Sequence, residues 1–404
     1  MPPLSKRVLF IVSQPFFAWR GSPIRVGFDV QALAELGYTV DLLVPPFGND
    51  FSVPGVTIHR VRAMPGVDDL PIGPSLPKLI FDVLLYFRAR KMMKCNRYDA
   101  LHGVEDTGAV CALLVRRRGI PFIFEKHSDP TSHKRGFVRN QILSCYAAVE
   151  RWIIRRAGAV IGTGPDLAAY ASQVDPHKTV RAIPDIPSSL AETTAEAAAA
   201  ARGVFLQASH ELLVTYVGSF AVYQGIDLLF ESIPLVCRSD QRVRFVIVGG
   251  SSEEIAERKR QMSLVGVAER VTFAGKIPPD ELPAVLAGSD ILLSPRIAGA
   301  NTPLKLLDYL KAGRPIVATE NAANRQILDE TTAVFSAAEP DAFAAGIQGL
   351  LNDSDLRARL GRAGKGLLAG QYNYRYFRSA LGEIYERALC DVPERTPQQE
   401  RKYV

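Results

Sequence analysis

Short runs of apolar and β-branched residues alternate along the chain with longer segments whose apolar residues recur every three or four positions. In the first half, one helical pattern ends at Leu33, Leu36 and Gly37, where glycine is a typical helix stop. The short runs of this half lie at 8–12, 40–44, 100–102, 121–124 and 159–162. Strands that alternate with helices predict an α/β fold with a parallel sheet covered on both faces.

A second series of runs begins at Leu212, after an alanine-rich, weakly patterned stretch at 191–202. Its strands are expected at 214–217, 245–248, 271–273, 291–293 and 315–318, with a helix from about Gln224. A chain of 404 residues is long enough for two cores. We therefore expect domains at 1–190 and 211–372, a linker region at 191–210, a helix at 373–391 and a flexible tail at 392–404.

Composition narrows the class of protein. A hydrophobic content of 47% and a charged content of 22% are typical of a globular protein. The five cysteines are scattered without metal-ligand spacing, and the run at 8–12 is too short for a signal-peptide core. These features predict reduced cysteines and a cytoplasmic protein. The net charge of +6 permits attraction to nucleic acid, anionic lipid or phosphorylated small molecules.

The densest positive charge lies at 78–97, where an apolar block precedes Arg88, Arg90, Lys91, Lys94 and Arg97. Two interpretations stay open: an amphipathic surface that rests on anionic lipid, at the inner face of the membrane, or a core helix with a solvated end. The apolar part is too short to span a bilayer. The basic run 116–118 lacks the interleaved aromatics of a nucleic-acid platform, so we expect no nucleic-acid partner.

The most informative segment is 294–319, which reads as strand, loop, helix, turn and strand. Asn301 or Thr302 is a candidate N-cap, Pro303 suits the first turn, and Gly313 suits the C-terminal exit. Lys305 then falls in the first turn, where the helix dipole disfavours a cation unless an anion binds there. The alternative is an exposed ion pair between Lys305 and Asp308, three residues on.

The segment with Asn301, Thr302, Pro303, Leu304 and Lys305 resembles the donor-binding motif of retaining glycosyltransferase family four, especially a subgroup with Gly-x-Asn-Thr-Pro-Leu-Lys. The resemblance extends across nearly the whole chain. It implies the GT-B fold, in which two Rossmann-like, doubly wound domains face a cleft and the last helix crosses back to the N-terminal domain. The match implies further donor-binding residues: Gly218, Ser219, Gln224, Gly275, Lys276, Ile277 and Asp308. Gly249, directly after the strand at 245–248, is a further candidate.

In the N-terminal half, the segment 20–26 resembles the family's glycine loop near the reaction centre, and 124–129 resembles the strand end with an active-site histidine, here His127. The candidate residues for the acceptor side are Gly21, Ser22, Arg25, His102 and Glu105. A lone histidine is commonly structural, and a polar cluster at a strand end often only solvates a loop. The match favours a functional role for His127.

The chain departs from the family at two places. The first of the family's two glutamates is Ala300 here and the second is Asp308. The arginine and lysine that grip the donor diphosphate in many members are Ser219 and Gln224. Lys305 is then the clearest candidate cation for the diphosphate.

The resemblance implies a retaining hexosyltransferase that moves a sugar from a nucleoside diphosphate sugar to a glycan, lipid-linked or other hydroxyl acceptor, as in polysaccharide biosynthesis. Lys305 and His127 are the candidate catalytic residues, and no metal or cofactor is expected besides the donor. The absence of a G-x-G-x-x-G motif argues against a dinucleotide cofactor. Two alternatives remain: a nucleotide-sugar epimerase of the same fold, and a catalytically silent partner that binds nucleotide or glycan.

Overall fold

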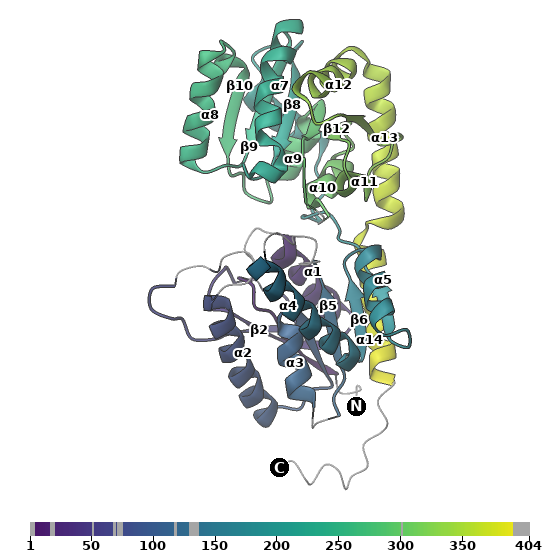
Figure 1. The fold of residues 1–404 in the computed structure, drawn as a ribbon. Coiled ribbons are helices and arrows are strands. Elements are labelled where there is room, and N and C mark those ends of the chain that lie inside the picture. The colour runs from purple at the N-terminus through teal and green to yellow at the C-terminus, as the bar shows by residue number, and fades with distance from the viewer. Residues whose placement is uncertain are drawn as a thin grey trace. The chain divides into compact units, whose positions relative to one another are not determined.

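The structure, a computed structural model, describes residues 5–16, 21–50, 52–67, 70, 76–116, 119–128, 137–299 and 302–390. The chain divides into two compact units (Figure 1). The N-terminal unit comprises Met1–Asp185 and Arg375–Val404, and the C-terminal unit comprises Ile186–Tyr374.

The N-terminal unit is built on a seven-stranded parallel sheet in the order β3-β2-β1-β4-β5-β6-β7. Its strands are β1 (Arg7–Ile11), β2 (Thr39–Val44), β3 (Val56–Arg60), β4 (Ala100–Val104), β5 (Phe122–Lys126), β6 (Ala159–Gly162) and β7 (Thr179–Ala182). The inner strands are apolar over nearly their whole length because helices bury both faces of the sheet.

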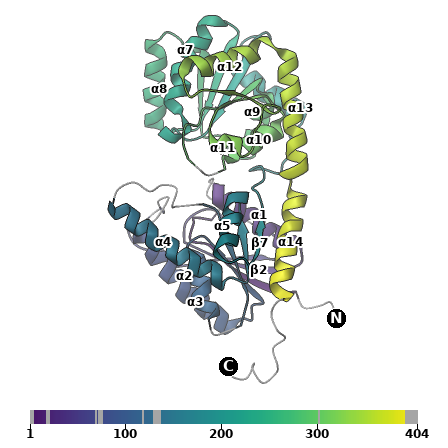
Figure 2. The same ribbon diagram turned by 45° about the vertical axis from the view of Figure 1, so that its right-hand side comes forward.

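One face of this sheet packs against α2 (Leu76–Cys95), α3 (Thr107–Val115), α4 (Phe137–Arg156) and α5 (Pro165–Val174). The other face carries α1 (Gly21–Glu35) and α14 (Tyr374–Cys390), which bury Val30, Leu33, Leu381 and Ile384. Figure 2 shows α14 beside α1 and β7. Arg378 of α14 pairs with Glu35, and Glu383 pairs with Arg181. The last helix therefore belongs to the N-terminal unit, as the resemblance implies.

The C-terminal unit is built on a six-stranded parallel sheet in the order β10-β9-β8-β11-β12-β13. Its strands are β8 (Leu212–Val217), β9 (Val243–Val248), β10 (Val271–Gly275), β11 (Ile291–Ser294), β12 (Ile316–Thr319) and β13 (Ala333–Ser336). Its helices are α6 (Ala195–Phe205), α7 (Ile226–Ser239), α8 (Ser252–Leu264), α9 (Leu282–Gly288), α10 (Leu304–Ala312), α11 (Ala322–Arg325), α12 (Pro340–Asn352) and α13 (Ser354–Gln371), with short 3₁₀ turns at Val222–Gln224 (η2) and Ala268–Arg270 (η3).

Neighbouring residues of the strands in this unit point to opposite faces of the sheet. Val214 and Tyr216 face α7 and α12, whereas Leu213 of the same strand faces the helices α9 and α10. Each unit is thus a doubly wound, Rossmann-like α/β domain, and the predicted fold class is confirmed.

The alanine-rich stretch of the region 191–210 forms α6, whose Arg202 donates to Gly288 and pairs with Asp290 within the C-terminal unit. One local expectation differs from the structure. Gly21, expected in a loop, opens helix α1, because glycine, serine and Pro23 are all tolerated in a first helical turn.

Candidate functional site

The order of strands in the C-terminal unit reverses between β8 and β11. Loops that leave the carboxyl ends of these two neighbours form the usual ligand crevice of an open α/β sheet. Here the loop after β8 carries Gln224, and the loop after β11 leads into α10 with Lys305. Tyr309 of α10 joins both strands, since its hydroxyl accepts from Val217 N at 3.0 Å and donates to Leu293 O at 3.2 Å.

Lys305 lies in the first turn of α10, and its ammonium group faces the loop after β8. Its Nζ donates to Gln224 Oε1 at 3.0 Å and lies 4.5 Å from the centroid of the Tyr216 ring. Within the described ranges, no carboxylate forms an ion pair with it. Burial, with the nearby charge of Arg296, lowers the pKa of Lys305 to about 7. The alternative interpretation, an ion pair between Lys305 and Asp308, is not found among the described residues, where no acidic side chain compensates the charge of Lys305.

Asp308 contacts the start of the C-terminal unit rather than Lys305. Its carboxylate accepts from Ser188 N at 2.7 Å and from Ser188 Oγ at 2.8 Å. Burial raises its pKa to about 6, against the opposing effect of these hydrogen bonds. A carboxylate has about four acceptor sites, so two hydrogen bonds leave room for further donors. The side chain also lines a small pocket, open to solvent, with Ser188, Glu192 and Lys311.

The glycines after β8, β9 and β10 lie close together. Gly249 N donates to Gly275 O at 2.6 Å, and a Cβ on Gly249 would lie only 2.0 Å from Gly218 O. A Cβ on Gly218 would come within 3.4 Å of Lys305 Nζ. The close approach of these backbones requires glycine at Gly249, and the end of β8 at Gly218 lies beside Lys305.

The other candidate donor residues are distributed around this group. Ser219 and Lys276 are exposed, and Ile277 packs against the core of the unit. Thr302 Oγ1 lies 3.5 Å from Gln326 Oε1. Pro303 is the N-cap residue of α10 rather than part of its first turn, and no side-chain cap accompanies it in the described chain. Leu304 opens the helix, while Ala300 and Asn301 lie outside the described residues.

Sequence reasoning missed Arg296, two residues after β11. It is 5% exposed, and its guanidinium lies 5.5 Å from the centroid of the Tyr223 ring. Burial lowers its pKa, and its own charge acts on Lys305. The sequence did contain a signal for this residue, because Arg296 lies between an apolar strand and a candidate anion-binding helix.

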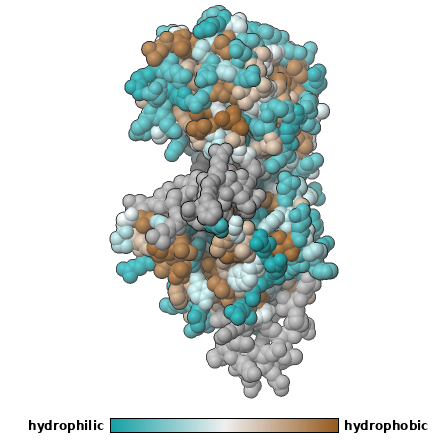
Figure 3. Space-filling view, viewed as in Figure 1, coloured by the Kyte–Doolittle hydropathy of each residue, from teal (hydrophilic) through white to brown (hydrophobic). Residues whose placement is uncertain are grey.

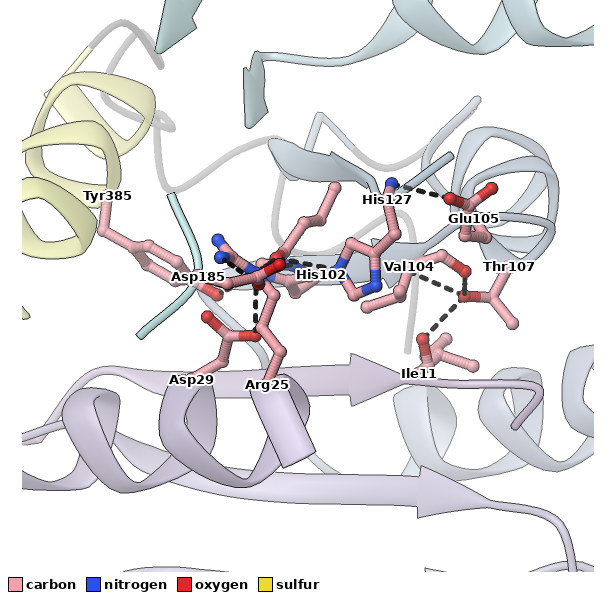
Figure 4. A network of polar contacts seen from close by, with 11 residues as sticks. Ile11, Arg25, Asp29, His102, Val104, Glu105, Thr107, His127, Asp185 and Tyr385 are labelled. Carbon is pink, nitrogen blue, oxygen red and sulfur yellow. Dashed lines mark hydrogen bonds and ion pairs between the residues drawn. The ribbon is translucent and has the colours of Figure 1, made fainter. Parts of the chain in front are cut away.

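In the N-terminal unit the strand order reverses between β1 and β4. Arg25 follows β1, His102 lies in β4, and Glu125 and His127 lie at the end of β5. These side chains form one buried polar network that reaches Tyr385 of α14 (Figure 4). Glu125 is its centre and was not singled out by sequence reasoning, although a carboxylate at the end of an apolar strand is a visible signal.

The direction of each hydrogen bond in this network follows from the charges. Arg25 and the two histidines hold the pKa of Glu125 well below its usual range, although burial opposes them. Burial lowers the pKa of His102, so this ring is neutral. Its Nε2–H then donates to Glu125 Oε2 at 2.9 Å, and Nδ1 accepts from Tyr385 Oη at 2.8 Å. His127 Nε2 donates to Glu125 Oε1 at 2.9 Å, which directs its Nδ1 away from this carboxylate.

Arg25 lies in α1 against Glu125. Its Nε donates to Glu125 Oε1, and its Nη1 donates to Asp185 Oδ1 at 3.0 Å. Asp29, one turn on, is buried with neither carboxylate oxygen hydrogen-bonded to a described residue. Burial and the charge of Glu125 raise the pKa of Asp29 well above its usual range. Gly21 and Ser22 lie in the first turn of the same helix and are partly exposed.

Glu105 positions the segment that carries His127. Its Oε1 accepts from His127 N at 2.6 Å and from Ser128 Oγ at 3.1 Å. Glu105 is also the only non-glycine residue in the described ranges with positive φ, at 52°. Such strain is retained where the surrounding structure requires it, often at functional sites. His127 is thus fixed by its backbone through Glu105 and by its ring through Glu125.

The basic segment forms helix α2, which has one buried and one exposed side. Phe81, Leu85 and Ala89 are buried in the core of the N-terminal unit. On the opposite side, Leu79 and Phe87 are 60% and 59% exposed, and Ile80 and Val83 are exposed as well. Figure 3 shows apolar side chains gathered on this part of the unit. We call Leu79, Ile80, Val83 and Phe87 the α2 apolar patch. The exposed side of α2 is thus apolar in its first half and basic in its second half, where Arg88, Arg90, Lys91 and Lys94 are exposed.

No helix within the described ranges has the length and apolar character needed to cross a membrane. Nor does any group of three or more histidine, cysteine or acidic side chains in the described chain have the arrangement of a metal site.

Comparison with known families decides the class of this protein. The family model "Glycosyl transferase 4-like domain" matches residues 21–184, and "Glycosyl transferases group 1" matches residues 211–353. Between them the two matches span most of both units. The chain belongs to the group 1 glycosyltransferases.

Relatives of this glycosyltransferase include the phosphatidyl-myo-inositol mannosyltransferase of Mycobacterium leprae, which is 23% identical over 372 residues, 90% of this chain and 93% of that protein. The GDP-mannose-dependent alpha-(1-6)-phosphatidylinositol monomannoside mannosyltransferase of Mycolicibacterium smegmatis is 32% identical over 169 residues, 40% of this chain and 44% of that protein. Sucrose-phosphate synthase from Thermosynechococcus elongatus has the same GT-B fold, with a TM-score of 0.74, 22% identity and coverage of 95% of this chain and 99% of that one.

Proposed function

We propose that this glycosyltransferase moves a hexose from a nucleoside diphosphate sugar to a hydroxyl group of a lipid-linked or polysaccharide acceptor, with retention of configuration and without a metal ion. The observation that carries the proposal is the uncompensated Lys305 beside Gln224 at the β8–β11 switch point. A diphosphate bound there would supply the missing anion. The name of the mannosyltransferase that depends on GDP-mannose supports a donor of this class.

In the proposed reaction, the bond between the anomeric carbon and the diphosphate oxygen breaks, and its electron pair stays on the leaving diphosphate. A bond forms from the acceptor oxygen to the anomeric carbon, and the acceptor's proton passes to a phosphate oxygen of the leaving group. Negative charge therefore grows on the diphosphate, where Lys305 stabilises it. Because the charge is smaller in the ground state, this interaction lowers the barrier as well as favouring binding.

His127 is the proposed contact to the transferred sugar. Its backbone and its Nε2 are both fixed by carboxylates, at 2.6 and 2.9 Å respectively. A ring held in this way is pre-organised, which limits the entropy lost when a substrate binds. Its remaining edge, with Nδ1, is the part proposed to face a sugar hydroxyl.

A lipid-linked acceptor is favoured by the α2 apolar patch and the basic residues beside it. Apolar side chains with neighbouring lysine and arginine form the surface that binds anionic lipid. We propose that α2 brings the enzyme to the membrane face where such an acceptor lies. The names of both mannosyltransferase relatives, which specify inositol lipids, support an acceptor of this kind.

The test begins with thermal stabilisation of the wild-type protein by UDP-, GDP- and ADP-sugars, because a bound donor raises the midpoint by mass action. The donor that binds is then incubated with lipid-linked acceptors, with and without EDTA. NMR of the product reports the anomeric configuration. Transfer that persists in EDTA with retained configuration supports the proposal. Conversion of the donor without acceptor would indicate an epimerase, and binding without turnover would indicate a catalytically silent partner.

A further inference from the structure

The β11–α10 loop carries a second cation beside Lys305, and the fold fixes its place. The backbone carbonyl of Arg296 accepts from Thr319 Oγ1 and, at 2.5 Å, from Asn321 Nδ2. Its Nε donates to Ala298 O at 2.8 Å. The two bonds to the carbonyl fix the backbone of Arg296, and the bond from Nε fixes its side chain; the residue is only 5% exposed. These contacts fix the position of Arg296 and keep its side chain out of solvent.

The loop after β8 is attached to this arginine. Ile297 N and Ala298 N both donate to Tyr223 O, at 3.1 and 3.3 Å. Gly225 has φ +70°, and a Cβ there would lie 1.8 Å from Pro295 O. The Tyr223 ring lies next to the Arg296 guanidinium, and Gln224, the next residue, accepts from Lys305. The two loops therefore form one rigid support for Arg296 and Lys305.

This support concentrates positive charge without an acidic partner. Within the described ranges, neither Arg296 nor Lys305 forms an ion pair with a carboxylate. Burying charge costs free energy unless a counter-charge compensates it. Two other arginines of the same unit do have acidic partners, since Arg244 pairs with Glu211 and Arg202 pairs with Asp290. Two neighbouring cations without a partner indicate that the missing anion comes from a ligand.

We propose that Arg296 is the second cation of the diphosphate site. It binds the diphosphate in place of the basic residues that the β8 loop lacks at Ser219 and Gln224. Gln224 no longer binds the phosphate directly; it orients the Lys305 ammonium by accepting its hydrogen bond. A guanidinium offers two parallel donors to one phosphate group, which a lysine cannot. The positive charge that many family members carry in the loop after β8 is thus supplied in this protein by the loop after β11. This inference rests on the proposed function, since it assigns a residue to the donor site of that reaction.

The experiment measures binding of UDP, GDP and ADP by calorimetry to the wild-type protein and to Arg296→Gln, Arg296→Lys and Arg359→Gln. Arg359 is an exposed arginine of α13 and is the matched control. For the nucleoside diphosphate that the wild type binds, Arg296→Gln is expected to raise the Kd by about tenfold to a hundredfold, the effect of losing a charge-assisted hydrogen bond. Arg296→Lys is expected to give an intermediate Kd, and Arg359→Gln a Kd within about twofold of the wild type.

A second measurement separates a binding role from a structural one. The charge of Arg296 lowers the pKa of Lys305, so its removal should raise that pKa. Affinity for the diphosphate should then decline at a higher pH than in the wild type. Loss of packing alone would not shift this pH profile. Wild-type affinity in both Arg296 variants would overturn the assignment. If the wild-type protein bound none of the three diphosphates, the proposed function itself would fail, which is a different result.

Discussion

The hydroxyl of Tyr385 on α14 lies 2.8 Å from Nδ1 of His102 on β4, and both side chains are buried. Since the other nitrogen of His102 donates to Glu125, this hydroxyl is the remaining partner of the ring. Tyr385→Phe leaves Nδ1 buried without a donor. We expect a loss of about 1–3 kcal/mol in the free energy of unfolding, measured by chemical denaturation.

The control for this change is Tyr86→Phe: among the described residues its hydroxyl has no hydrogen-bond partner, and its ring makes an edge-to-face contact with Phe87 and packs against the core. It should leave the free energy of unfolding within about 0.5 kcal/mol of the wild type. Equal losses in the two variants would show that the Tyr385–His102 contact does not stabilise the protein.

The sequence predicted α14 but not this contact. Its apolar positions recur with helical spacing, so the helix is visible in the pattern. The partner of Tyr385 lies 283 residues away, and only the topology of the sheet brings β4 and α14 together. A pattern reports which side of an element is buried and carries no information about which distant side chain it meets.

Edge strands mark the other limit of prediction. The inner strands of both sheets, and the edge strand β10, were evident as apolar runs, whereas β3, β7 and β13 were not predicted. All three lie at the edge of a sheet, and β3 and β7 are only partly buried. With less surface to bury, β3 includes the polar residues Thr57, His59 and Arg60, which interrupt the apolar signal.

Lys305→Met is expected to reduce kcat by about a hundredfold or more, the usual effect of removing one group that stabilises developing charge in a transition state. Lys259→Met, an exposed lysine of α8, serves as the control and should retain wild-type turnover. Initial rates with the donor identified by thermal stabilisation measure both. Substantial turnover by Lys305→Met would remove this residue from the mechanism.

The stability of the unliganded protein should also report on Lys305. Its pKa is lowered to about 7 in the folded state, against 10.5 for an ordinary lysine. Between these two pH values the unfolded chain binds more protons than the folded one, so this group makes stability rise with pH. Lys305→Met removes that contribution. We expect the variant to be more stable than the wild type at pH 6, and the difference in midpoint to shrink towards pH 10.

Asp308→Asn tests the carboxylate at Ser188. The folded-state pKa of Asp308, about 6, lies above the ordinary 3.8, so the folded protein binds more protons between these values. The contribution of this group to stability is therefore fully present below about pH 4 and is lost as pH rises through 6. The asparagine variant should lack this dependence in denaturation curves recorded from pH 4 to 7.

Measurements of donor binding test a second role of Asp308, which is to accept hydrogen bonds from the ribose hydroxyls of the donor. Asp308→Asn should weaken binding of the nucleotide sugar by about tenfold if the carboxylate accepts from ribose hydroxyls. Ser188→Ala removes only the Oγ donor and should bind the donor as the wild type does. If both variants lost affinity equally, the effect would come from the Ser188 contact and not from the ribose.

The α2 apolar patch gives the last prediction. Val83 and Phe87 lie one helical turn apart and are both exposed, so the double variant Val83→Ser/Phe87→Ser removes apolar surface without touching the core. We expect it to lose most of its binding to vesicles of mixed neutral and anionic phospholipid in a sedimentation assay, while transfer to a short soluble acceptor is unchanged. Burial of a phenylalanine side chain contributes about 1.5–3 kcal/mol, a large part of the affinity for a surface.

The control for this experiment is Leu264→Ser, which removes an apolar side chain that is 88% exposed in the C-terminal unit. It should bind vesicles as the wild type does. Binding of the wild type should also fall with added salt and with neutral vesicles, because the basic residues of α2 contribute roughly 1 kcal/mol each through screened attraction to anionic lipid. Unchanged binding by the double variant, or insensitivity to lipid charge, would place the membrane contact elsewhere and leave α2 without this role.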